Sequence, residues 1–212
     1  MKLSMRRTAA LAAAAMLAFL AVGCSSKDSS SDSAGSTKAA SADPVAQYGG
    51  DMIKHWAKDG YEITVEVDGR YITEDESKKI AKYIASIGRS DGKLMEESVH
   101  PAALKYVLDA NGFSDAGAYV SYLHETLMQY IGEDYEFEYA TVESLIDEST
   151  GFDFSRYDQI ILDAEPDAEI TNRKKVSLDA LYDHTNKSLN VHMGGYIEVY
   201  IYTINGEPFI LS

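Results

Sequence analysis

The sequence contains a single cysteine, Cys24, among its 212 residues. A chain with one thiol cannot form an intrachain disulfide, so its folded part must be held together by a hydrophobic core. Hydrophobic residues make up 45% of the chain and charged residues 25%, which is usual for a globular protein and excludes a chain that is disordered throughout. The length suits one ordinary domain.

Positive charge is scarce, with 19 Lys and Arg residues against 34 Asp and Glu residues and a net charge of −15. Loss of residues 1–23 would remove three positive charges and no negative ones, which takes the net charge from −15 to −18. Nucleic-acid binding needs clustered Lys and Arg, so a nucleic-acid partner is excluded. The acidity favours solubility and is compatible with cationic ligands.

Long hydrophobic runs are absent except at the start, where residues 9–22 are uncharged and rich in Ala and Leu. This run is too short to span a bilayer as a helix, and it follows a basic start, so it predicts an export signal. The basic start consists of Lys2, Arg6 and Arg7. The run ends in the sequence LAVGC at residues 20–24, which resembles the lipobox of bacterial lipoproteins.

The lipobox resemblance implies that the thiol of Cys24 is acylated with diacylglycerol and that residues 1–23 are cleaved as a signal peptide. Cys24 would then be the first residue, lipid-anchored at the extracytoplasmic face of the cell membrane, and more than one acyl chain makes such attachment durable. The alternative is an ordinary signal peptide with an incidental cysteine. Residues 24–46 are dominated by Ser, Ala and Asp, which predicts a flexible tether reaching roughly 25 Å. A single domain is expected over residues 47–212.

The first half of this domain shows mainly helical patterns. A short apolar helix is expected around residues 52–56, then a strand over 61–67 and a hairpin turn at Asp68 and Gly69. Thr73 and Glu76 have capping-box spacing, which predicts a helix that ends at Gly88. Further helices are expected over residues 94–99, from Pro101 to Gly112, and from a Ser114 cap to Gly132.

The second half shows alternation typical of strands. Strands are expected over residues 135–141, 170–182 and 196–204, another opens at Val191, and Asn205 and Gly206 predict a type I′ hairpin before residues 209–211. Residues 155–162 fit a short helix, with a strand as the alternative. Helices followed by strands predict an α+β domain with helices packed on one face of a curved antiparallel sheet.

Residues 77–212 resemble the nuclear transport factor 2-like superfamily, whose domains have a cone-like α+β fold. The resemblance depends on a helix with a polar break at residues 83–91, an aromatic and acidic strand at 135–141, a strand at 170–178 and a final hairpin at 200–211. The chain departs from the family in its last hairpin, where Gly206, Glu207, Pro208 and Phe209 replace the usual Gly-Lys-Trp-Tyr. Pro208 cannot donate a ladder hydrogen bond, which favours an edge strand. The fold implies no particular activity.

Three motifs resemble catalytic or metal-binding sequences, but each is explained better by a structural role. Residues 88–92 match GxSxG but follow a helix, whereas a nucleophile elbow needs a preceding strand. His124 and Glu125 begin an HExxH-like sequence whose fifth residue is Met128, so His124 is interpreted as a boundary residue. The acidic loop at residues 147–158 lacks the glycine and final glutamate of a calcium loop. No metal or cofactor is predicted.

Fifteen tyrosines are many for this length, and several fall in the predicted sheet. Together with a nearby histidine they are candidates for lining a pocket, although cross-strand aromatic packing explains them more simply. The candidates are Tyr135, Tyr139, His192, Tyr196, Tyr200 and Tyr202.

Because no complete catalytic set is present, the leading hypothesis is a non-catalytic lipoprotein that binds a small ligand or a protein partner outside the membrane. One alternative is a small hydrolase or isomerase that uses the cone cavity, where Tyr, Asp and His perform acid and base steps in enzymes of the resembling family. The other is an accessory subunit of a membrane complex.

Overall fold

The computed structural model describes residue 48, the backbone of residues 53–57, and residues 63–132, 135–182 and 187–212. The described residues all belong to one compact unit, Asp43–Ser212. The expected signal peptide, the lipidated Cys24 and most of the tether lie outside the described residues. Within the described part of the chain, no helix has the length and apolar character needed to cross a membrane.

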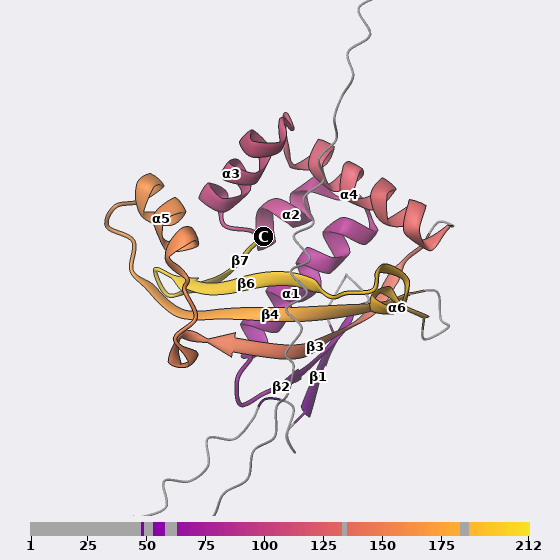
Figure 1. Cartoon of the computed structure of the whole chain (residues 1–212), viewed down its shortest axis with the longest axis horizontal. Coiled ribbons are helices and arrows are strands. Elements are labelled where there is room, and N and C mark those ends of the chain that lie inside the picture. The colour runs from indigo at the N-terminus through magenta and orange to yellow at the C-terminus, as the bar shows by residue number, and fades with distance from the viewer. Residues whose placement is uncertain (1–47, 49–52, 58–62, 133–134, 183–186) are drawn as a thin grey trace, which may run out of the picture. The chain divides into compact units, whose positions relative to one another are not determined.

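Seven strands form one curved mixed sheet, in the order β1-β2-β3-β4-β6-β7 with the short β5 beside β4 (Figure 1). The strands are β1 (Ile53–Ala57), β2 (Thr64–Asp68), β3 (Phe137–Asp147), β4 (Ile170–Tyr182), β5 (Lys187–Ser188), β6 (Ile197–Ile204) and β7 (Glu207–Leu211). The α+β class is confirmed. The sheet is not wholly antiparallel, however, because β2 pairs with β3 in parallel.

In the described part of the chain, four helices lie between β2 and β3, one lies between β3 and β4, and one lies between β5 and β6. They are α1 (Glu74–Gly88), α2 (Gly92–Ser98), α3 (Pro101–Asn111), α4 (Ala116–Ile131), α5 (Ser155–Ala164) and α6 (Leu189–Met193), with a 3₁₀ turn η1 (Glu148–Thr150). The predicted capping box at Thr73 is present, and Gly112 and Gly132 end α3 and α4 in left-handed conformations. The cap of α4 is Asp115, which accepts a hydrogen bond from the Ala118 amide, and not Ser114.

One face of the sheet packs on α1, which crosses behind the strands in Figure 1. Lys174 on β4 bonds to Glu76 of α1, so Val176 and Leu178, which follow at alternate positions, face the same helix. Both are fully buried, as are Ile80 and Ile84 of α1. This side of the sheet therefore holds the main hydrophobic core.

The opposite face of the sheet is mostly polar, except where the segment leading into α5 covers β6. Lys175 pairs with Tyr200 in the register between β4 and β6, so both lie on this opposite face. The rings of Phe152 and Tyr157 contact Tyr200 with centroid distances of 6.3 and 4.6 Å. A small aromatic layer thus closes this part of the second face.

Several expectations for local structure are corrected. Residues 53–57 form β1 and not a helix, and the turn at Asp68 leads into α1 without a returning strand. The segment around Val191 is the short helix α6. The helix over residues 155–162 and the turn at Asn205 and Gly206 are confirmed, the latter with φ angles of 53° and 85°.

The predicted edge position of Pro208 is confirmed, because β7 is the last strand on the sheet path. The outer side of this strand is partly covered. Val99 forms an isolated parallel bridge with Ile210, and the His100 amide donates to the Ile210 carbonyl at 3.1 Å. The chain between α2 and α3 therefore shields an edge that would otherwise be open to pairing with another chain.

Candidate functional site

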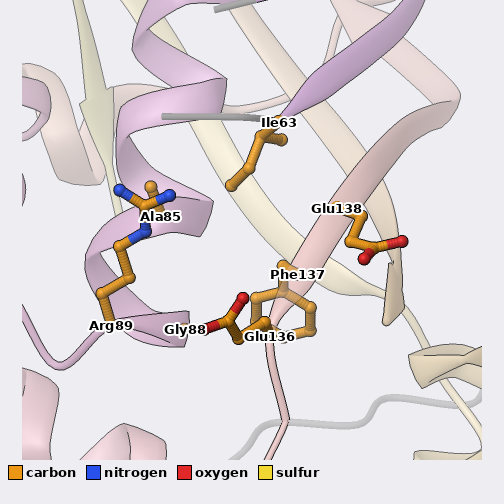
Figure 2. A pocket seen from close by; sticks show the side chains of 7 residues that line it. All are labelled: Ile63, Ala85, Gly88, Arg89, Glu136, Phe137 and Glu138. Atoms are coloured by element: carbon orange, nitrogen blue, oxygen red, sulfur yellow. The ribbon is translucent and has the colours of Figure 1, made fainter. Parts of the chain in front are cut away.

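A cavity of about 410 Å³ lies where α1 ends and β3 begins (Figure 2). Its lining comes from three elements that are distant in the sequence: the residue before β2, the last turn of α1 and the start of β3. The lining residues are Ile63, Ala85, Gly88, Arg89, Glu136, Phe137 and Glu138. A volume of this size falls within the usual range for small-ligand sites.

The floor of the cavity is apolar and closely packed. Ile63 and Ala85 are each 1% exposed, and Phe137 is 6% exposed. Gly88, the last residue of α1, lets the helix end lie directly against the Phe137 ring, because a Cβ at this position would be 3.0 Å from Phe137 Cδ2. The absence of a side chain at Gly88 therefore sets how closely α1 approaches β3 beside the cavity.

The rim of the cavity is charged. Figure 2 shows Arg89 extending from the end of α1, the carboxylate of Glu136 beside Gly88, and the carboxylate of Glu138 on the other side of Phe137. Arg89 and Glu136 are exposed, and Glu138 is partly buried. The lining thus combines one guanidinium and two carboxylates around a closely packed base, an arrangement that can orient a polar ligand.

The GxSxG-like turn at residues 88–92 connects α1 to α2 and has a structural role. The Oγ atoms of Ser90 and Ser121 are 2.7 Å apart, and Asp91 caps α2 by accepting from the amides of Lys93 and Leu94. A Cβ on Gly92 would be 2.6 Å from the Gly117 amide nitrogen in α4. The serine follows a helix and is held by a second hydroxyl, so no nucleophile elbow is formed.

The structure brings Tyr200 and Tyr202 together in the aromatic layer beneath α5. Tyr202 donates a hydrogen bond to the Phe154 carbonyl at 3.1 Å, and its ring lies 6.0 Å from that of Phe154. Burial raises the pKa of Tyr202, and burial raises the pKa of the neighbouring Tyr157 to about 12. These phenols stay protonated near neutral pH, so they act as packing groups there and not as bases.

The other four candidates lie at different places. Tyr135 is buried and stacks on His124 at a centroid distance of 4.9 Å, and the exposed His192 lies 5.8 Å from the ring of Tyr182. Tyr139 donates a hydrogen bond to Glu66, and Tyr196 is 41% exposed.

The six aromatic candidates therefore do not converge, and the cavity described above is lined by other residues. In the sequence, Glu136 and Glu138 are simply the polar positions of the aromatic and acidic strand predicted over residues 135–141. The sequence does contain a signal for the charged rim of this cavity, because the polar break after α1 and the acidic start of β3 are the two charged segments beside it. Their proximity depends on the tertiary structure.

The side chains of the other tested motifs also have structural partners. His124 Nδ1 lies 3.1 Å from the Ile87 carbonyl, in agreement with a boundary histidine. In the acidic loop, Asp147 caps η1, Asp153 accepts from the Ser155 amide, and Asp158 forms an ion pair with Arg173. Among the described residues, no group of three or more His, Cys, Asp or Glu side chains is placed to hold a metal ion.

No protein-family model matches this chain, and comparisons with curated proteins and with solved structures found no significant match. Any functional conclusion must therefore come from the chemistry of the chain itself.

Proposed function

We propose that this protein is a non-catalytic, lipid-anchored binding protein at the extracytoplasmic face of the cell membrane, with the cavity between α1 and β3 as its ligand site. The observation that carries the proposal is a cavity of about 410 Å³ bordered by the charged side chains of Arg89, Glu136 and Glu138. Such charged groups can fix the orientation of a polar ligand. The lipobox-like sequence ending at Cys24 supports the anchor.

The described side chains favour binding over hydrolysis or isomerisation. The Ser90 hydroxyl is hydrogen-bonded to the Ser121 hydroxyl, and the buried Tyr157 and Tyr202 have raised pKa values. General acid and base catalysis works best with groups whose pKa lies near the operating pH.

Ligand-observed NMR on the processed lipoprotein in detergent micelles would test the binding site. A library of small fragments should yield some that bind the wild type. These fragments should not bind Glu136→Trp, because the indole would cover the cavity from its rim. Glu96→Trp is the matched control, since Glu96 is an exposed glutamate on α2 outside the cavity lining. Equal binding to both variants would place the ligands elsewhere and refute the proposed site.

The anchor is tested by Cys24→Ser. The wild type should be recovered in the membrane fraction with a mass that shows acylation at Cys24 and loss of residues 1–23. The variant should lack the acyl chains and leave the membrane fraction. An unacylated wild type, or one that starts at another residue, would refute the anchor. Recovery of a constant protein partner from wild-type detergent extracts would favour an accessory subunit instead.

A further inference from the structure

Aromatic side chains gather on α3, on α4 and in the connection between these two helices. Tyr106 of α3 is 41% exposed, and Tyr122 of α4 is 39% exposed. The ring of Phe113, in the connection, lies 5.4 Å from that of Tyr119 and 5.3 Å from that of Tyr122. These four residues, Tyr106, Phe113, Tyr119 and Tyr122, form what we call the aromatic face. Tyrosine is enriched at protein interfaces, because its ring supplies contact area at a small cost in conformational entropy.

The aromatic face continues toward α5, which packs beside α3 (Figure 1). Burial raises the pKa of Tyr119, and the neighbouring phenols of Tyr83, Tyr157 and Tyr122 act in the same direction. Tyr119 therefore lies near both Tyr122 on its own helix and Tyr157 on α5. The rings contributed by three helices are thus close to one another, although they are distant in the sequence.

Arg156 of α5 shows which chemical group these rings can receive. Its guanidinium lies 5.7 Å from the ring centroid of Tyr106 and 5.9 Å from that of Tyr157, and its Nη2 donates a hydrogen bond to the Tyr106 hydroxyl at 3.3 Å. A guanidinium is attracted to the face of an aromatic ring and keeps N–H donors for other groups. The protein thus already contains, beside its aromatic face, the kind of contact that an arginine of another chain would make.

Carboxylates accompany both exposed rings. Asp109 follows Tyr106 by three residues on α3, and Glu125 follows Tyr122 by three residues on α4, a spacing that makes each carboxylate and ring neighbours on the helix surface. Asp109 forms an ion pair with Lys105, but their side chains are 66% and 75% exposed. An ion pair this exposed contributes little, so the carboxylate of Asp109 can exchange its partner.

We propose that the aromatic face of α3 and α4 docks an arginine-containing segment of a partner protein. Residues 101–131 contain one lysine, no arginine and three carboxylates, so their charge matches a basic partner and repels an acidic one. A partner arginine would lie over Tyr122 as Arg156 lies over Tyr106, and its N–H donors would meet Glu125. This surface is separate from the cavity between α1 and β3, because it shares no residue with the cavity lining.

Calorimetric titration of the processed lipoprotein in micelles with short peptides tests the docking surface. The probe is a peptide of four Arg-Gly repeats. A peptide of citrulline-Gly repeats retains the shape of the side chain without its charge, and a peptide of Lys-Gly repeats retains the charge without the planar fork. The arginine peptide should bind about tenfold more tightly than the citrulline peptide and several-fold more tightly than the lysine peptide.

Two single variants locate the contact on the aromatic face. Tyr122→Ser removes a ring and Glu125→Gln removes a charge, and each should weaken binding of the arginine peptide about fivefold. Tyr130→Ser is the matched control, since Tyr130 belongs to the same helix, is 54% exposed and lies outside the aromatic face. It should bind the peptide like the wild type. Thermal melting confirms that each variant is folded.

The remaining outcomes each count against the proposal. If Tyr122→Ser binds the arginine peptide as tightly as Tyr130→Ser does, the attraction is a diffuse effect of the net charge and the docking surface is wrong. If the lysine peptide binds as tightly as the arginine peptide, the ring contact is wrong. Self-association that is lost in Tyr122→Ser would assign the face to a second copy of this chain and overturn the proposal.

A glycan is the other occupant that the test separates. If an oligomer of N-acetylglucosamine binds the wild type but not Tyr122→Ser, and the arginine peptide does not bind, the face recognises sugar and the proposal is wrong. The cavity variant Glu136→Trp should bind the arginine peptide like the wild type. A failure of the docking surface is thereby distinguishable from a failure of the proposed ligand site.

Discussion

The two ends of α1 are built in opposite ways. At the amino-terminal end, the Glu76 side chain accepts hydrogen bonds from the Thr73 amide at 2.8 Å, from Lys174 Nζ at 2.6 Å and from Asn172 Nδ2 at 3.0 Å. Glu76 is 1% exposed and Lys174 6%. At the carboxyl-terminal end, Gly88 and Arg89 border the cavity, and Arg89 is exposed.

This difference separates stability from binding along one helix. The amino-terminal end is closed because a buried ion pair and a capping box satisfy the polar groups and connect α1 to β4. The carboxyl-terminal end has no basic residue in its last turn and stops at Gly88, and the exposed Arg89 that follows it borders the cavity. We therefore expect substitutions at the first end to affect folding and substitutions at the second to affect binding.

The largest effect is expected from Lys174→Met, which would leave the carboxylate of Glu76 buried without its cation. Loss of one partner of a buried ion pair typically costs about 3–5 kcal/mol of unfolding free energy. Urea unfolding of the processed lipoprotein at pH 7 measures this loss. The double variant Glu76→Gln/Lys174→Met should lose less than the single variant, because no buried charge remains.

Lys175→Met is the matched control for this ion pair. Lys175 is the next residue on the same strand, and its bond to Glu198 at 2.8 Å lies on the opposite face, where the Glu198 side chain is 51% exposed. Its loss should cost less than about 1 kcal/mol. Equal losses for Lys174→Met and Lys175→Met would show that the amino-terminal end of α1 is not specially stabilised.

A smaller effect is expected just beyond the other end of α1, from Gly92→Ala. The new Cβ would lie 2.6 Å from the Gly117 amide nitrogen, so α2 and α4 must separate, at a cost of about 2 kcal/mol. Gly117→Ala is the control from the other side of this contact, since its Cβ would meet only the Asp115 side chain at 3.2 Å. Thermal melting should show a marked decrease for Gly92→Ala and little change for Gly117→Ala.

A pH-dependent effect is expected at the start of α3, where His100 is 3% exposed and its Nδ1 accepts from the Ala102 amide at 3.3 Å. Burial lowers the pKa of His100, against the opposing effect of Glu165, so the unfolded chain takes up the proton first. Stability is therefore complete above the usual histidine pKa of about 6.5 and decreases as the pH falls toward the lower folded value.

His100→Asn isolates this titration, because asparagine retains a cap acceptor but does not ionise in this range. Between pH 8 and pH 5.5 the wild type should lose more unfolding free energy than His100→Asn, because only the wild type has a group at this position whose pKa is lower in the folded chain than in the unfolded chain. Parallel pH curves for the two proteins would show that the imidazole is not the group responsible.

The smallest effect is expected from Ser90→Ala, in the turn between α1 and α2. Removal of one hydroxyl from the 2.7 Å contact with Ser121 should cost about 0.5 kcal/mol, because both serines are only partly buried and Ser121 can bond to water instead. Urea unfolding measures this value, and ligand binding should be unchanged. A loss above about 2 kcal/mol would mean that the turn has a larger role than connecting two helices.

Local signals predicted much of the fold. The helix from Thr73 to Gly88, the strand over residues 170–182 and the hairpin at Asn205 and Gly206 agree with the structure, because each depends on periodicity or turn chemistry within a few residues. The short helix expected around residues 52–56 is wrong, because helix and strand periodicities are not distinguishable in so short an apolar segment, and residues 53–57 form β1.

The cavity between α1 and β3 could not be predicted from the sequence because it depends on contacts between distant segments. Arg89 and Glu136 are separated by three helices in the sequence, and their common position at the cavity follows from the packing of α1 against β3. The role of the tyrosines could not be assigned from the sequence because their rings suit the core as well as a pocket. Tyr202 is fully buried and Tyr196 is 41% exposed, although both belong to the same alternating segment.

The parallel pairing of β2 with β3 also constrains the order in which this protein can fold. Glu66 and Tyr139, which are hydrogen-bonded across these strands, are 73 residues apart. The pairing of β2 is therefore complete only when a segment that follows four helices is in place. Until then the free backbone groups of β2 are open to other chains, so partly folded molecules should be prone to aggregation.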